Sequence, residues 1–154
     1  MTGIIHLLVG ATIALLIPDT PTMFVVAFFS HYLFDFIPHI DPATFVEHSQ
    51  PYTARQKLGI AIDAVLIVSI MVTLIVSQQV NTHILIGALV SQLPDLLSPL
   101  EKYKFFYPFH RFHAACHWDK RKAKHWAWYI AGLINPIIVC AICLFIIARL
   151  TRVV

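Results

Sequence analysis

The chain has 154 residues, of which 58% are hydrophobic and 12% are charged, and its formal net charge is +3. Soluble domains are about half apolar and about a quarter charged, so this composition predicts an integral membrane protein and excludes a separate soluble catalytic domain. The positive charge lies mostly in one loop beside apolar segments, which points to membrane topology and disfavours nucleic acid as a partner. We expect one transmembrane domain over residues 1–154.

Five apolar segments follow one another along the chain, at residues 4–17, 22–37, 58–76, 82–97 and 126–148. They predict an all-α membrane protein with about five transmembrane helices plus an amphipathic interfacial helix. The third and fifth segments can cross a hydrocarbon core of about 30 Å alone. The other three are shorter, so we expect them to extend further or to thin the bilayer locally. Pro136 is expected to kink the last segment.

Basic residues predict how these segments are oriented. They occur in the loops after the second and fourth segments, whereas the loops on the opposite side hold none, and positive loops stay in the cytoplasm. We therefore expect a multi-pass protein of the inner (cytoplasmic) membrane with a cytoplasmic N-terminus. The basic residues of these loops are Arg55, Lys57, Lys102, Lys104, Arg111, Lys120, Arg121, Lys122 and Lys124.

A faint internal repeat accompanies this pattern. Residues 31–41 align with residues 91–101, and each stretch follows an apolar segment with a polar residue near its start. The alignment predicts two helical hairpins related by duplication, with their polar groups around a common axis.

Four of the five apolar segments carry an ionisable residue toward the same predicted end. His6 lies in the first segment, His31 and Asp35 in the second, Asp63 in the third and Asp95 in the fourth. Ionisable groups at membrane depth are costly and usually face a cavity, pair with a partner or bind an ion. Histidines and carboxylates at one depth predict a metal site near the cytoplasmic face.

His39 extends the pattern of the second segment. The i, i+4, i+8 spacing of His31, Asp35 and His39 places them within a sector of about 80° on one helix. Pro38 interrupts that helix, so His39 could fold back toward the site from the loop. Two alternatives stay open: a solvated helix end, and a buried Asp35 that only pairs with a histidine or an arginine.

A third set of histidines follows the fourth segment. If that stretch is helical, His110, His113 and His117 lie within a stripe of about 60°, an arrangement that suits metal chelation. Aromatic residues flank them, which is typical of a helix at the membrane interface. Arg111 beside the stripe is a candidate phosphate ligand. The alternative is an interfacial helix whose polar stripe happens to be histidine.

Three short motifs resemble one family. His6-Leu-Leu-Val-Gly10 is similar to its opening H-x-x-x-G helix, the run from Gly87 to Pro94-Asp95 is similar to its G-A-x-x-P-D segment, and His110-Arg111 followed by His117 resembles its H-R-x-x-T-H element. The family is that of the membrane-bound metal-dependent hydrolases, also described as LexA-binding, inner-membrane-associated hydrolases. The resemblance implies a metal-dependent hydrolytic activity.

These patterns predict a membrane-embedded hydrolase that cleaves a lipid-linked phosphoester with a metal-activated water. One or two divalent ions are expected, with zinc favoured by the imidazoles and manganese or magnesium as alternatives. Asp63 or His31 is the expected general base or orienting residue, and Arg111 the expected phosphate ligand. An ion or proton/metal transporter and a small haem protein are the competing hypotheses. The candidate metal ligands are His6, Asp35, His39, Asp95, His110, His113 and His117.

Overall fold

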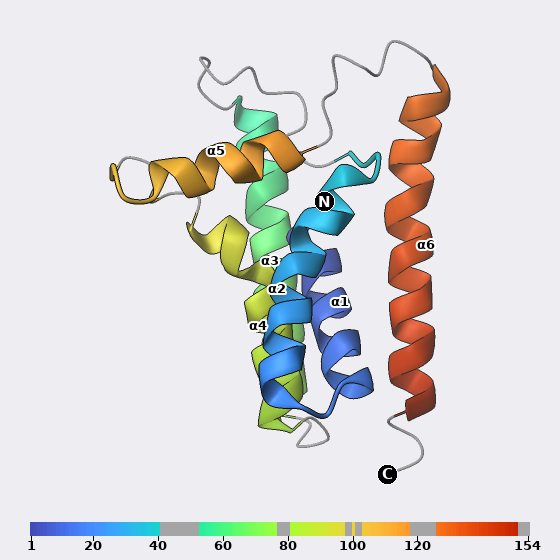
Figure 1. The fold of residues 1–154 in the computed structure, drawn as a ribbon. Coiled ribbons are helices and arrows are strands. Elements are labelled where there is room, and N and C mark those ends of the chain that lie inside the picture. The colour runs from blue at the N-terminus through green and yellow to red at the C-terminus, as the bar shows by residue number, and fades with distance from the viewer. Residues whose placement is uncertain (41–52, 77–80, 98–99, 101–102, 118–125, 151–154) are drawn as a thin grey trace.

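The structure is a computed structural model that describes residues 1–40, 53–76, 81–97, 100, 103–117 and 126–150. These residues form helices and no strand (Figure 1). Several of the basic residues used above to predict topology, from Lys120 to Lys124, lie outside the described residues. The helices are α1 (Gly3–Leu16), α2 (Thr20–Phe36), α3 (Ala54–Val76), α4 (Thr82–Leu97), α5 (Tyr107–Cys116) and α6 (Trp126–Leu150).

The centre of the molecule is a close crossing of α1 and α4. A Cβ atom added to Gly10 would lie 2.2 Å from the carbonyl oxygen of Gly87, and one added to Gly87 would lie 2.6 Å from the carbonyl oxygen of Gly10. The two backbones therefore touch, and only glycine fits at these positions. α2 packs against both helices and completes a core with Leu7, Met23 and Ala88.

The prediction of about five transmembrane helices is wrong. Among the described residues, only α6 and the Ala54–Thr73 part of α3 are long and apolar enough to cross a membrane. α1, α2 and α4 have 14, 17 and 16 residues and thus reach only about 21–26 Å, short of a core of about 30 Å. α1 and α4 bury their apolar side chains mainly against each other, because a short apolar helix serves equally well as a core element.

Two helices of this kind suggest a membrane protein, although weakly, because core helices of soluble proteins reach similar length and hydropathy. In this chain both helices are poorly covered. The apolar window of α3 has no buried residue, and that of α6 has 11% buried residues. Both therefore present apolar side chains outward.

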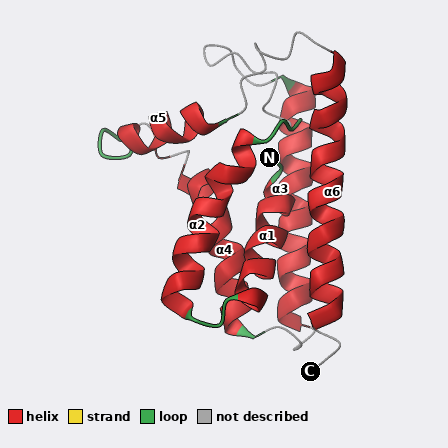
Figure 2. Cartoon of the chain, turned by 45° about the vertical axis from the view of Figure 1, so that its right-hand side comes forward, coloured by secondary structure: helices red, strands yellow, loops and turns green. Residues whose placement is uncertain are grey.

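The predicted pair of duplicated hairpins is not found among the described helices. α1 and α2 do pack together, but α4 packs on α1 and α2, and α3 packs on α1. α5, the segment predicted as an interfacial helix, extends from the bundle with its axis transverse to the other helices (Figures 1 and 2). It contacts α2 through aromatic rings: Phe112 lies 5.0 Å from Tyr32 and Phe109 lies 6.2 Å from Phe28, between ring centroids.

Candidate metal centre

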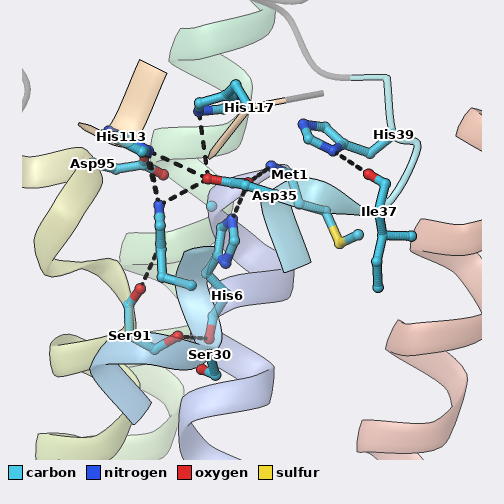
Figure 3. Close-up of polar contacts among 12 residues, drawn as sticks. Met1, His6, Ser30, Asp35, Ile37, His39, Ser91, Asp95, His113 and His117 are labelled. Carbon is cyan, nitrogen blue, oxygen red and sulfur yellow. Dashed lines mark hydrogen bonds and ion pairs between the residues drawn. The ribbon is translucent and has the colours of Figure 1, made fainter. Parts of the chain in front are cut away.

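Ionisable side chains from α1, α2, α4 and the C-terminal end of α5 meet at one end of the core, around the carboxylate of Asp35 (Figure 3). Its Oδ1 lies 3.1 Å from Nε2 of His6. Its Oδ2 lies 3.1, 3.3 and 3.4 Å from the Nε2 atoms of His31, His113 and His117, respectively. We call the following residues the His/Asp cluster: His6, His31, Asp35, Asp95, His113 and His117.

Asp95 closes a second side of the His/Asp cluster. Its Oδ1 lies 3.5 Å from Nε2 of both His31 and His113. The side chains of His31 and Asp35 are fully buried, whereas those of Asp95 and His117 are 36% and 35% exposed. The cluster therefore has a sealed interior and an open rim formed by Asp95 and His117.

The sequence places these groups by helical spacing. His31 and Asp35 are four residues apart on α2, as are His113 and His117 at the end of α5, so each pair shares one helix face. His6 is held at the same level because the Ser91 hydroxyl donates a 2.7 Å hydrogen bond to the carbonyl oxygen of His6. α4 thus fixes α1 one turn from the Gly10–Gly87 crossing.

The hydrogen bond of His31 defines which nitrogen faces the cluster. Its Nδ1 lies 2.8 Å from the carbonyl oxygen of Ser91. A carbonyl oxygen only accepts, so Nδ1–H is the donor, and the neutral ring presents the lone pair of Nε2 to Asp35, Asp95 and His113. A metal-binding histidine is usually oriented in this way through its other nitrogen. Lone pairs so close to one another repel unless a cation, either a proton or a metal ion, lies among them.

The distances between the ligand atoms suit a bound metal ion. With metal–ligand bonds of about 2.0–2.1 Å, the ligand atoms of a tetrahedral site are about 3.3–3.4 Å apart, and the nitrogen–oxygen distances in the cluster are 3.1–3.5 Å. Among the described residues, three overlapping sets have ligand atoms within 4.8 Å of one another. The sets are His6, His31 and Asp35; His31, Asp95 and His113; and Asp35, His113 and His117.

In the metal-free cluster, the histidines differ in how readily they hold a proton. Burial lowers the pKa of His6 to about 4, against the hydrogen bond with Asp35. Burial also disfavours charge on His31, but the carboxylates of Asp35 and Asp95 outweigh it and raise the pKa of His31 to about 9. Burial would raise the pKa of Asp35, yet hydrogen bonds with His113, His31 and His6 hold it well below its usual range. Without a metal ion, the proton on His31 and the Met1 ammonium group therefore compensate the charge of Asp35.

Two of the predicted site residues lie away from the cluster. The Asp63 carboxylate accepts hydrogen bonds from the backbone nitrogens of Gly3 at 2.8 Å and Ile4 at 3.3 Å. It therefore caps the N-terminus of α1 from α3. Arg111 is exposed on α5, two residues before His113.

The two remaining predicted ligands, His39 and His110, are in none of the three sets. His39 is buried, and its ring centroid lies 5.7 Å from that of His117. His110 is half-buried on the first turn of α5. The structure therefore brings together five of the seven predicted metal ligands, together with the predicted catalytic residue His31.

Sequence reasoning missed the groups that support the cluster. Ser91 binds both His31 and the backbone of His6, and the Met1 nitrogen forms an ion pair with Asp35. The phenol oxygen of Tyr32 is buried without a hydrogen-bond partner in the described part of the chain, and the Tyr32 ring lies 5.8 Å from that of His113. Ser91 stood three residues before Pro94-Asp95 in a motif already singled out, whereas nothing in the sequence pointed to Met1 or Tyr32.

No protein-family model, curated protein or solved structure matches this chain. The resemblance of its motifs to the membrane-bound metal-dependent hydrolases therefore stays a prediction, and the geometry of the His/Asp cluster is the observation that bears on function.

Proposed function

We propose that the protein is a metal-dependent hydrolase of the type that its motifs resemble, with the His/Asp cluster as its metal site. The orientation of His31 carries the proposal. Its Nε2 atom faces Asp35, Asp95 and His113 at distances that match the edges of a tetrahedral site. Burying this many ionisable groups in an apolar interior is costly, and a bound metal ion would offset that cost.

Zinc is the proposed metal, as one or two ions, because imidazole and carboxylate together suit it. His31, His113, Asp35 and Asp95 would hold it, with His6 and His117 beside them. A divalent ion in this place supplies Lewis acidity and lowers the pKa of water toward about 7, which is the requirement for hydrolysis at neutral pH. The open rim at Asp95 and His117 gives a substrate access to one side of the site.

A lipid-linked phosphoester is the proposed substrate class. Arg111 is exposed on the helix that carries His113, and its planar guanidinium suits a phosphate. The exposed apolar faces of α3 and α6 suit a lipid environment. The N-terminal end of α3, with Arg55 and Lys57, lies at the same end of the molecule as α5 (Figure 1). This end would face the cytoplasm of an inner membrane.

A transporter is less well supported than a hydrolase. Below the cluster, α1 and α4 are in backbone contact at Gly10 and Gly87, and the described core around them is made of apolar side chains such as Leu7 and Met23. The buried hydroxyl of Thr12 donates to the carbonyl oxygen of Leu8 in its own helix. This described region therefore offers no chain of polar groups that could carry an ion from the His/Asp cluster to the other end of the molecule.

Elemental analysis of the full chain purified in detergent tests the metal site. We expect the wild type to contain zinc and His31→Ala to lose it, whereas Asp19→Asn, at the opposite end of α2, retains it. A folded wild-type protein that neither contains nor takes up a divalent metal would contradict the proposal. The activity is tested separately, by release of phosphate or alcohol from vesicle-borne phosphoesters with and without a chelator.

A further inference from the structure

α6 has an interrupted turn beside the His/Asp cluster. Pro136 lacks an N–H group, so the carbonyl oxygen of Gly132, four residues earlier, has no donor within the helix. The backbone N–H of Ile40 donates to this oxygen instead, at 3.1 Å. The break in α6 thus offers a hydrogen-bond acceptor to the segment that follows α2.

Two further features fit the same segment against α6. The Asn135 side chain donates from Nδ2 to the carbonyl oxygen of Pro38 at 3.0 Å. A Cβ atom added to Gly132 would lie 3.0 Å from Cγ1 of Ile40 and 3.4 Å from the carbonyl carbon of His39, so glycine allows the close approach. Gly132, Asn135 and Pro136 together bind the backbone of residues 38–40.

The bound segment places His39 at the edge of the cluster. The His39 Nδ1–H donates to the carbonyl oxygen of Ile37 at 2.8 Å, which fixes the orientation of the ring. His39 is 3% exposed, and its ring lies 5.7 Å from that of His117, between centroids. Figure 3 shows His39 on the α6 side of the cluster, next to His117. His117 is partly exposed and follows the last turn of α5, so a neighbour that restrains it matters.

We propose that Gly132, Asn135 and Pro136 are positioning residues of the metal site. They hold His39 against His117, and this contact keeps the His117 imidazole in place for a metal ion beside Asp35. The inference rests on the proposed function, because it assigns α6 a role in a metal-binding cluster. It goes beyond that function because it makes α6 part of the site, although this apolar helix contributes no ionisable residue to the cluster.

Pro136→Ala in the full chain is the decisive variant. It restores an N–H group that competes with Ile40 for the carbonyl oxygen of Gly132. Removing a proline from a helix interior ordinarily preserves or improves stability, so a purely structural role predicts an unchanged site. We expect instead faster amide exchange at Ile40, a loss in Co²⁺ affinity of about tenfold, and an altered Co²⁺ absorption spectrum.

Further variants separate positioning from a general effect on α6. Asn135→Asp keeps the shape of the side chain but loses the donor to Pro38, and should act in the same direction. Leu133→Ala, on an exposed position of the same turn, is the matched control and should change neither measurement. In a His117→Ala background, Pro136→Ala should cause no further loss of Co²⁺ affinity, because it acts through His117.

Unchanged Ile40 exchange and an unchanged Co²⁺ spectrum in Pro136→Ala would overturn the inference. So would an equal loss of affinity with and without His117. A folded wild type that binds no Co²⁺ contradicts the proposed function itself. The exchange of Ile40, measured without metal, would then still show whether α6 holds the segment, so the two failures are distinguishable.

Discussion

The same three helices, α1, α2 and α4, form two contrasting regions. At the Gly10–Gly87 crossing, backbones touch and the surrounding core is apolar, whereas one turn away, at His6 and Ser91, the interior is filled with ionisable and polar groups. The contrast shows how a small protein can stabilise a buried polar site. A rigid apolar contact fixes the helix axes, so the ligand atoms above it are held at defined distances without large side-chain freedom.

The largest expected effect comes from breaking the apolar region. Gly10→Val places a branched side chain where a Cβ alone would lie 2.2 Å from a backbone carbonyl. We expect a loss of about 3 kcal/mol in the free energy of unfolding, the upper range for an overpacked core, and loss of bound metal. Thermal unfolding and metal content measure both. Ala61→Val, at an exposed position on α3, is the control. A Gly10→Val variant that still binds metal would show that the crossing does not position the site.

The next effect comes from the centre of the polar region. Asp35→Asn removes the carboxylate that four histidines contact. We expect Zn²⁺ affinity to fall by more than about 100-fold, because removing even an outer partner of a ligand costs about 10- to 100-fold. Competition with a chelator of known affinity measures the change. Native-like zinc binding by Asp35→Asn would show that the ion does not bind at Asp35.

Two histidines on α5 sharpen the comparison. His113 belongs to two of the ligand sets, whereas His110, one turn earlier, belongs to none. His113→Ala should lower Zn²⁺ affinity by about 100-fold, and His110→Ala should leave it unchanged. The same chelator competition compares the two variants, and equal losses would mean that the whole histidine stripe binds the ion.

The pH dependence of the metal-free protein reports on the polar region alone. The pKa of His31 is raised from 6.5 to about 9, so its contribution to stability is complete below pH 6.5 and is lost as the pH rises through about 9. We expect the melting temperature of the chelator-treated protein to fall over this range. Saturation with zinc should remove the fall, because the ion replaces the proton. A flat profile without metal would contradict a charged His31.

The smallest effect is expected at Asp63. Asp63→Ala removes the cap of α1 and should cost about 1 kcal/mol in the free energy of unfolding. Zinc affinity should stay close to that of the wild type, because Asp63 is outside all three ligand sets. Urea unfolding and metal titration test these statements. A folded, zinc-loaded Asp63→Ala that has lost hydrolytic activity would restore the predicted catalytic role of this residue.

The sequence predicted the positions of the helices more reliably than the surroundings that each helix faces. The apolar segments at 4–17 and 82–97 correspond to α1 and α4 within a residue or two. Their hydropathy could not reveal that they face each other rather than lipid, because the same side chains suit both surroundings. The crossing at Gly10 and Gly87 is a tertiary contact that hydropathy does not encode. Helix length and hydropathy are what leave α3 and α6 as the candidate spans among the described helices.

The site shows the same limit. Predicted depth grouped His6, Asp35 and Asp95, and helical spacing added His113 and His117; the structure places these five side chains together. Depth does not define direction around a helix axis, so Asp63 was grouped with them although it faces the N-terminus of α1. His110 lies outside the three ligand sets, whereas His113, in the C-terminal half of α5, belongs to two of them.

The attachment of α5 has a consequence for how the protein responds to its surroundings. In the described part of the chain, this helix meets the core chiefly through three phenylalanine ring contacts with α2 and through its terminal imidazoles. An ion bound by both those imidazoles and the core would hold α5 against the bundle. Its removal would allow α5 to detach well before the bundle unfolds. Scarcity of metal would then be sensed as a change of shape at the protein's surface.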